Sequence, residues 1–306
     1  MGQVKAGGAL PLAHPHPFRN QTMGSKGQPS AGGAGGQRPP GFLLLLALTL
    51  TALAPPSRPT DAVLSYRAYA HGFQILRFQV RLAMWPGGYR MRLSYRTTGL
   101  VGFFYRGHQV DHVAGTWRAG RAAPYRYTAD GVWHGTPHHL ILTYRDGVPR
   151  VRAVMPPIRA ERHKVPVAEQ RDTIDTMSAV IDLLRHLAVR HSCIDSVHTF
   201  DGRRLSMIAA RDAGRVVLAR TGRSVFAGPA RRCDFTGRML AGFLYGHRAR
   251  DSRPMRGSAW FAPLAPGGVP LPVHLQFQTD WFGEVEMDLT GVRLGPAAMT
   301  APRAAG

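Results

Sequence analysis

The sequence has few cysteines, few lysines and few acidic residues. Its two cysteines, Cys193 and Cys233, have a spacing that matches no standard zinc finger or ribbon. Only three of the 39 basic residues are lysines, and 18 acidic residues leave a formal net charge of +21. Because arginine, alanine, glycine and proline are all enriched, we attribute part of this charge to a GC-rich genome and expect no nucleic-acid partner.

Motifs of the common enzyme classes are also missing. The chain has no G-x-S-x-G elbow and no H-E-x-x-H, and its "AGGAGG" stretch is low-complexity sequence rather than a phosphate-binding loop. The histidines of "WHGTPHH" at 133–139 are typical of a polar turn between strands, and Glu284, Glu286 and Asp288 of a solvated strand face. We therefore expect a protein that is not an enzyme, with no catalytic residue, no metal and no cofactor.

No apolar run reaches the roughly 20 residues that a membrane-spanning helix needs. The longest, "GFLLLLALTLTALA" from Gly41, has fourteen residues and is preceded by Arg38, which is typical of a secretory signal. Ala52 and Ala54 form an A-x-A-like site, so we expect cleavage near Ala54 and a periplasmic mature protein. An uncleaved N-terminal anchor is the alternative, and translation from Met23 would shorten the long segment ahead of the run.

Strand patterns dominate the exported part. Even-numbered apolar residues from Leu76 to Met84 alternate with polar ones, and odd-numbered residues from Tyr89 to Thr97 repeat the pattern after the turn sequence "WPGG". The same alternation runs from Val273 to Trp281 and from Val285 to Leu289, with Gly283 at the reversal. Both pairs predict antiparallel hairpins with one apolar face, and so a sheet that packs on one side only.

One amphipathic helix is predicted at about 173–190. Its apolar residues fall on a single stripe: Ile174, Met177, Ile181, Leu184 and Ala188. Asp172 is the expected N-cap, with Asp175 in the first turn. The predicted fold is mainly β, a curved antiparallel sheet with this helix covering part of its apolar face.

The two cysteines leave three interpretations open. In an oxidising compartment two cysteines in one small domain usually pair, and closing a loop of about 40 residues contributes roughly 4 kcal/mol on the loop-entropy estimate. We therefore predict a disulfide between Cys193 and Cys233. The alternatives are a zinc site that also uses His191 and His198, or a catalytic thiol with His191 as its base.

The order of these motifs resembles the bacterial exported family called domain-of-unknown-function family 3108. The resemblance covers about Val63 to Arg293. It rests on "AHGFQILRFQVRL", "TTGLVGFFYRGHQ", "KVPVAEQRDTIDTMSAVIDLL", "HTFDGRRLSMI", "RRCDFTG" and "PLPVHLQFQTDWFGEVEMDL", with a departure around "RHLAVRHSC", where the segment between helix and cysteine is short. It implies a half-barrel similar to that of periplasmic lipoprotein carriers, an exported protein with this cysteine pair, and no established activity.

The expected organisation has four parts. Residues 1–54 form an N-terminal extension and secretory signal, 55–62 a linker, 63–294 a single antiparallel half-barrel domain, and 295–306 a flexible tail.

Two functions follow from this fold. The first is a binding or carrier module for an apolar or lipid-like ligand on the concave face, unless the helix fills that face. Its candidate ligand residues are Phe78, Leu82, Tyr89, Leu93, Phe277 and Trp281. The second is an envelope-associated structural or assembly factor that docks on anionic surfaces. Its candidate residues are Arg77, Arg81, Arg90, Arg92 and Arg96.

Overall fold

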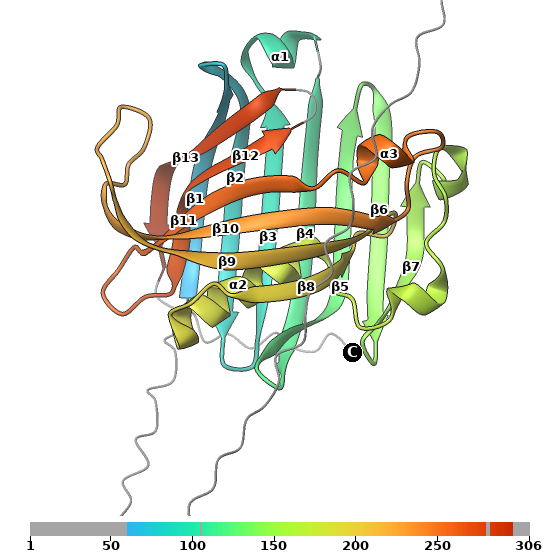
Figure 1. Cartoon of the computed structure of the whole chain (residues 1–306), viewed down its shortest axis with the longest axis horizontal. Helices are drawn as coiled ribbons and strands as arrows, with labels where there is room; N and C mark the ends of the chain where they lie inside the picture. The colour runs from blue at the N-terminus through green and yellow to red at the C-terminus, as the bar shows by residue number, and fades with distance from the viewer. Residues whose placement is uncertain (1–59, 105, 280–281, 296–306) are drawn as a thin grey trace, which may run out of the picture. The chain divides into compact units, whose positions relative to one another are not determined.

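The computed structural model describes residues 60–104, 106–279 and 282–295 (Figure 1). The expected signal run, the cleavage site near Ala54, the tail from 296 onwards and Trp281 lie outside the described residues. No helix in the described ranges is long and apolar enough to cross a membrane.

Thirteen antiparallel strands form one sheet, in the order β7-β6-β5-β4-β3-β2-β1-β13-β12-β11-β10-β9-β8. The first seven strands are β1 Thr60–Ala70, β2 Phe73–Trp85, β3 Gly88–Thr97, β4 Gly107–Arg118, β5 Arg121–Trp133, β6 Thr136–Arg145 and β7 Val148–Met155. The other six are β8 Asp195–Phe200, β9 Leu205–Leu218, β10 Gly228–Ala241, β11 Met255–Pro263, β12 Pro270–Thr279 and β13 Gly283–Leu294. Neighbours in the sheet are neighbours in the sequence, except that the terminal strands β1 and β13 pair in its middle.

The sheet curls until it is nearly closed into a barrel. In Figure 1 strands β8–β11 cross in front of strands β2–β6, and the two edge strands are β7 and β8. The chain between these edges contains the short helices η1 Ile158–Ala160 and η2 Val167–Gln170 and the long helix α2 Thr176–Arg190. Arg162 in this connection forms an isolated bridge with Leu244, which follows β10. The predicted class, a mainly β curved antiparallel sheet, is confirmed, and its closure goes beyond a half-barrel.

Tight turns explain why the strands follow one another as hairpins. At Ala119–Gly120 and Asp146–Gly147 both residues have positive φ angles, as a type I′ turn requires. This turn matches the right-handed twist of the flanking strands, and glycine adopts it without steric cost. The turns at 71–72 and 134–135 have the same pattern, and the second confirms the polar turn expected within 133–139.

Both predicted hairpins are present. Leu82 pairs with Met91 across β2 and β3, and Phe277 pairs with Val285 across β12 and β13. The predicted linker is wrong at its C-terminal end, because β1 begins at Thr60, which pairs with Met84. Strand β1 was missed because its small alanines weaken the alternation, although the structure buries every second residue from Ala62 onwards.

Helix α2 begins three residues later than predicted. Asp175, not Asp172, is the N-cap, and its carboxylate accepts hydrogen bonds from the Ser178 backbone N–H at 2.8 Å and from the Ser178 hydroxyl at 2.7 Å. Asp172 has φ +58° and lies in the preceding turn, where its N–H donates to the Gly147 carbonyl. Of the predicted apolar stripe, Met177, Ile181 and Leu184 are buried and Ala188 is half-buried, whereas Ile174 precedes the helix and forms an isolated bridge with Thr199.

A second, polar stripe on α2 is buried as well. Ser178, Asp182 and His186 are four residues apart and face the strands. The Ser178 hydroxyl is 2.9 Å from the Tyr89 hydroxyl, and Asp182 accepts from the Ala122 backbone N–H at 2.6 Å. These bonds attach the helix to β3 and β5.

The cation of this polar stripe is supplied by Arg121. Its guanidinium lies 3.0 Å from Asp182 and 2.8 Å from Asp195, and His186 lies 3.1 Å from Asp195. Asp182, His186 and Asp195 have the grouping of a metal site, with ligand atoms within 4.8 Å of one another. Because the Arg121 guanidinium lies against both carboxylates, we interpret the cluster as an ion-pair network that fixes α2.

The two ends of the curled sheet differ. At the α2 end, Arg185 of α2 donates to the carbonyl of Gly120 in the β4–β5 turn. At the opposite end, which we call the α1 end, the short helix α1 Gly99–Phe104 joins β3 to β4, beside the β1–β2 turn. A third helix, α3 Arg248–Asp251, follows β10.

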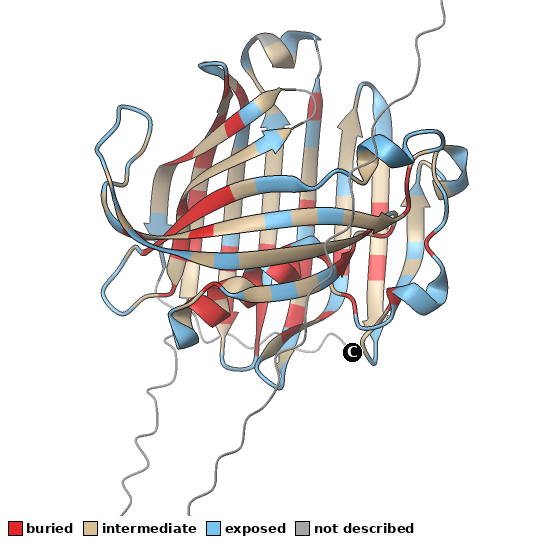
Figure 2. Cartoon of the chain, viewed as in Figure 1, coloured by how far each residue is buried: buried red, intermediate tan, exposed pale blue. Residues whose placement is uncertain are grey.

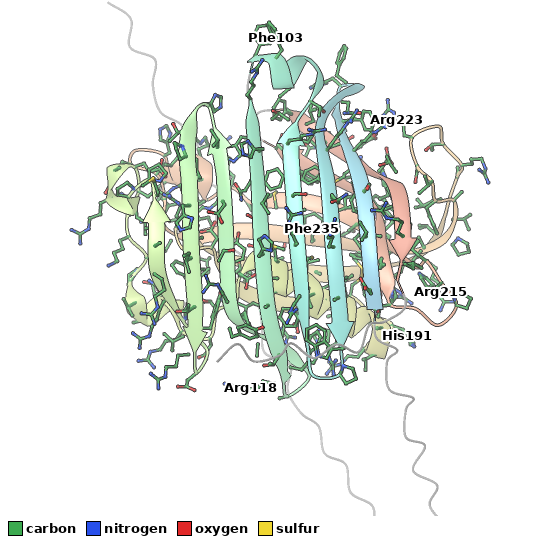
Figure 3. The ribbon with its side chains drawn as sticks, turned by 180° about the vertical axis from the view of Figure 1, so that it is seen from behind. Phe103, Arg118, His191, Arg215, Arg223 and Phe235 are labelled. Atoms are coloured by element: carbon green, nitrogen blue, oxygen red, sulfur yellow. A yellow bond between two sulfur atoms is a disulfide. The ribbon has the colours of Figure 1, made fainter. Side chains whose placement is uncertain are left out.

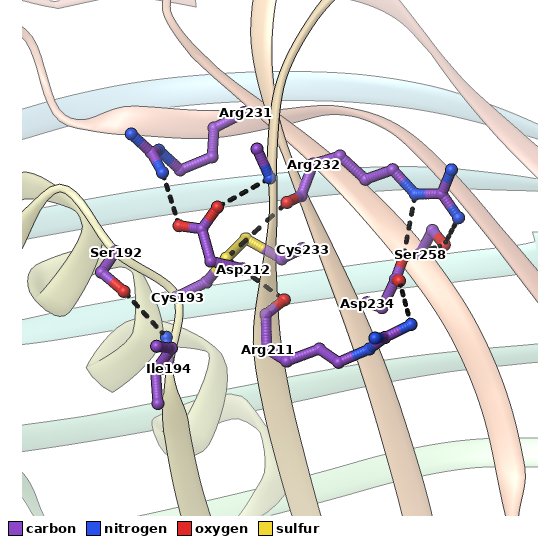
Figure 4. Close-up of a disulfide and its surroundings, with 11 residues drawn as sticks. Ser192, Cys193, Ile194, Arg211, Asp212, Arg231, Arg232, Cys233, Asp234 and Ser258 are labelled. Atoms are coloured by element: carbon purple, nitrogen blue, oxygen red, sulfur yellow. Dashed lines mark hydrogen bonds and ion pairs between the residues drawn. A yellow bond between two sulfur atoms is a disulfide. The ribbon is translucent and has the colours of Figure 1, made fainter.

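The disulfide between Cys193 and Cys233 is present, with a Cα–Cα distance of 5.9 Å (Figure 4). It ties the chain that leaves α2 to the middle of β10, beside the ion pair of Arg231 with Asp212. Because both sulfurs are in the bridge, neither the zinc site nor the catalytic thiol considered from the sequence fits the structure.

Removing the bridge should destabilise the domain. We expect Cys193→Ala with Cys233→Ala to lower the free energy of unfolding by about 4 kcal/mol, because the 40-residue loop is no longer closed in the unfolded chain. Urea denaturation of the double variant and of reduced wild type measures this, and the two should agree. Free thiols in unfolded, unreduced mature protein would contradict the pairing.

Candidate functional site

The inner face of the sheet carries the predicted apolar residues. Pairing places Phe78 opposite Tyr95, Val80 opposite Leu93 and Leu82 opposite Met91. The even-numbered residues of β2 and the odd-numbered residues of β3 therefore share one face, as the alternation predicted. Phe277 of β12 lies on the same face, because it is the cross-strand partner of Gly257 on β11 and of Val285 on β13.

Helix α2 divides this inner face in two. At the α2 end Leu82 is 2% exposed and Tyr89 is fully buried, and both belong to the core that packs around the helix. Towards the α1 end, Phe78 and Leu93 are only half-buried. Figure 2 shows how burial varies along the strands. The helix thus fills one end of the barrel and leaves apolar residues uncovered at the other. Two of the predicted ligand residues, Leu82 and Tyr89, are core residues and not available to a ligand.

Aromatic rings line the uncovered part. Phe78 stacks on Tyr95 with ring centroids 5.4 Å apart, and Tyr95 contacts Trp133 at 5.8 Å. Across the barrel, Phe235 of β10 pairs with Gly257, and a side chain at Gly257 would collide with the Phe235 ring and with Phe277. The glycine therefore makes room for two phenylalanines, both half-buried. Phe235 was not predicted, because β10 has a short and arginine-rich alternation.

A polar chain lies next to these rings. Trp133 donates to the Gln109 side-chain oxygen at 3.1 Å, and Gln109 donates to the Asp111 carboxylate at 2.7 Å. Asp111 points to the inner face and is buried, and this burial raises its pKa to about 6. The Gln109 hydrogen bond opposes the rise, whereas the negative charges of Asp175 and Asp130 add to it. Asp111 was not predicted as a site residue, since a single acid within an otherwise ordinary strand carries no local pattern.

An ion pair reaches the same region from the β8–β9 connection. Arg204 lies 2.7 Å from Asp201. Burial raises the pKa of Tyr95, and the positive charge of Arg204 partly opposes this rise. Asp201 also accepts from the backbone N–H groups of Arg203 and Arg204, and its pKa is lowered despite burial. The inner face thus combines apolar rings with one arginine and one buried acid.

The predicted arginines occupy the opposite, outer face of β2 and β3. This face is turned towards the viewer in Figure 3. Register places Arg77 directly opposite Arg96, and Arg81 opposite Arg92. Like charges directly opposite each other in a sheet are destabilising. No ion pair links the five predicted arginines to an acidic residue in the described ranges. The outer face therefore holds concentrated positive charge.

Three of these arginines line a hollow of about 300 Å³ on the outer face. Its charged and titratable lining residues are Asp61, Arg81, Arg90, Arg92, His112 and Arg126. Partial burial lowers the pKa of His112, and the charge of Arg92 lowers it further. Four guanidinium groups against one carboxylate make this hollow suited to an anion such as phosphate or carboxylate.

A second hollow of about 570 Å³ lies over β9–β12, and there two of the three lining arginines are ion-paired. Arg211 and Arg232 both lie 2.8 Å from Asp234, which also accepts from the Ser258 hydroxyl at 2.7 Å. The first hollow therefore holds a larger excess of positive charge than the second, where Arg211 and Arg232 share the Asp234 carboxylate.

Over residues 65–290 the sequence matches the family described as "Protein of unknown function (DUF3108)". The chain belongs to this family. No curated protein matches the DUF3108 chain. Among solved structures it is similar to a beta-barrel-like protein of domain of unknown function DUF1849 from Brucella abortus. The TM-score is 0.48 and the identity 11%, covering 78% of this chain and 99% of that chain.

The buried acid of the DUF3108 domain should make its stability depend on pH. The pKa of Asp111 is raised, so between about pH 4 and pH 6 the folded state holds a proton that the unfolded state has lost, and stability falls as pH rises through this window. We expect Asp111→Asn to be more stable than wild type by about 1–3 kcal/mol at pH 7.5.

Thermal denaturation of both proteins from pH 4 to pH 8 measures this difference. It should shrink as the pH falls towards 4, because the wild-type carboxyl is then protonated in the folded state and about half protonated in the unfolded state. Two profiles that stay parallel over the whole range would show that Asp111 has no raised pKa.

Proposed function

We propose that this DUF3108 protein is a non-enzymatic, exported carrier that binds an apolar or lipid-like ligand on the uncovered part of its inner face. The observation that carries the proposal is the division of this face by α2. One end is sealed by a buried helix, and the other keeps Phe78, Leu93, Phe235 and Phe277 half-buried. Apolar side chains are normally buried as far as the fold allows, so an uncovered aromatic face is a candidate ligand site.

The chemistry of this face favours an amphipathic ligand. The aromatic rings of β2, β3, β10 and β12 offer apolar contact to an acyl chain. Arg204 offers a cation for a carboxylate or phosphate head, since its side chain is about half exposed although it pairs with Asp201. We therefore propose fatty acids and related single-chain lipids as the ligand class.

The arginine hollow favours a second candidate function, that of an envelope-associated factor which docks on anionic surfaces. Its support is the absence of acidic partners for Arg77, Arg81, Arg90, Arg92 and Arg96 among the described residues, whereas Arg211 and Arg232 of the second hollow pair with Asp234. The two functions use opposite faces of the sheet and can be separated experimentally.

Binding of a fluorescent fatty acid to the mature, oxidised protein tests the carrier. We expect saturable binding by the wild type. Phe277→Arg and Phe235→Arg should each lower the affinity at least tenfold, because an acyl chain that covers the inner face would have to displace water from the new guanidinium group. Circular dichroism and thermal denaturation establish that each variant is folded.

The matched control is Val217→Arg, which adds the same side chain at an exposed position of β9. It should bind like wild type. The carrier is rejected if wild type shows no saturable binding, or if both inner-face variants bind as well as the Val217→Arg control.

A further inference from the structure

The α1 end of the barrel exposes a group of phenylalanines that the core does not use. Phe103 and Phe104 of α1 are 72% and 71% exposed, and Phe73 at the start of β2 is 65% exposed. Figure 3 shows Phe103 at the tip of α1, beyond the ends of the strands. We call Phe73, Phe103 and Phe104 the aromatic rim. Large exposed apolar side chains gathered on one edge are typical of an interaction surface.

The rim is held rigidly by the sheet. The Thr98 N–H donates to the Ile75 carbonyl at 2.9 Å, and the Gln74 side chain donates to the Thr98 hydroxyl at 2.8 Å, so α1 is attached to the first residues of β2. Val101 packs on the small core formed by Ala68, Ala70, Ile75 and Val285. With one side of α1 anchored in this way, the two phenylalanines remain outside as a consequence of the fold.

A row of arginines crosses the outer face just behind the rim. Arg67, Arg77 and Arg96 are consecutive partners across β1, β2 and β3, and His108 of β4 continues the row. Arg67 is also the cross-strand partner of Asp288 on β13. The Asp288 carboxylate, however, accepts a hydrogen bond from His274 at 2.8 Å and forms no ion pair with Arg67 among the described residues. The three arginines have no ion pair within the described part of the chain.

We infer that the α1 end docks on the surface of an anionic lipid bilayer, with the aromatic rim in the acyl boundary and the arginine row at the phosphates. Phe73 and Arg77 are four residues apart on β2, or about 13 Å along the strand. Interfacial segments bury their apolar side chains about 5–10 Å below the headgroups, so flexible arginine side chains at this distance reach the phosphate level. The positive charge of the row complements the anionic lipid.

This inference does not depend on the carrier function, because docking needs no ligand on the inner face, but it rests on the second candidate function, to which it adds the aromatic rim and the lipid bilayer. Salt-sensitive vesicle binding that Phe103→Ser with Phe104→Ser leaves unchanged would overturn the inference and leave that second function standing. The test is co-sedimentation of the full mature protein with vesicles of phosphatidylcholine containing 30% phosphatidylglycerol, and with vesicles of phosphatidylcholine alone, over a range of salt concentrations. We expect binding to the anionic vesicles that weakens as salt increases.

Two double variants separate the two contributions. Arg77→Gln with Arg96→Gln should weaken binding to anionic vesicles about 30-fold and reduce its salt dependence. Phe103→Ser with Phe104→Ser should weaken binding about tenfold or more at every salt concentration. Loss of folding is not expected from the first variant, because it removes a like-charge pair.

Each variant has a matched control elsewhere on the chain. Arg211→Gln with Arg256→Gln removes the same charge from the second hollow, and Val217→Ser with Val225→Ser removes exposed apolar side chains away from α1. Both controls should bind vesicles like wild type. The inference is overturned if wild type does not bind anionic vesicles, or if the controls lose as much binding as the rim and row variants. It is also overturned if the protein binds free inorganic phosphate through the arginine row but does not sediment with the anionic vesicles.

Discussion

The burial of α2 on two of its sides is the constraint on which the rest of the structure depends. A helix inside a barrel must satisfy every polar group that it brings with it. Ser178, Asp182 and His186 meet this requirement through Tyr89, the Ala122 N–H and the Arg121 network. These partners fix the helix at one end of the barrel, and the inner-face residues towards the other end remain half-buried.

The two faces of β2 and β3 are consequently specialised in different ways. Their inner side chains change along the strands from sealed core to half-buried aromatic surface, whereas their outer side chains place arginine against arginine. A sequence selected for stability alone would place acidic residues opposite these arginines, as β10 places Asp234 beside Arg211 and Arg232. The like-charge pairs on β2 and β3 cost stability, and they occur on a part of the surface that is available to an anion.

The sequence allowed a good part of the fold to be predicted, because alternation and helical periodicity are local. The hairpins around residues 85–88 and 279–283, most of the apolar stripe of α2 and the cysteine pair were correct. The helix start was displaced, since both Asp172 and Asp175 have capping side chains and only the tertiary position of Ser178 and Tyr89 decides between them. The set of inner residues that α2 covers and the burial of Asp111 both depend on contacts between segments that are distant in the sequence. Such contacts produce no local sequence pattern from which they could be predicted.

The pairing of β1 with β13 has a consequence for how the domain forms. Two meanders, β1–β7 and β8–β13, consist of neighbouring hairpins, but the seam between them joins Ala62 to Leu294. Contacts of such long sequence separation are slow to form, because the loop entropy is lost before the contact is gained. A chain that emerges from its N-terminus onwards therefore carries β1 as an unpaired edge until its last strand has been made. During that interval the exposed edge of β1 can pair with a strand of another chain. Correct assembly of the barrel therefore requires β13 to pair with β1 before a strand of another molecule does.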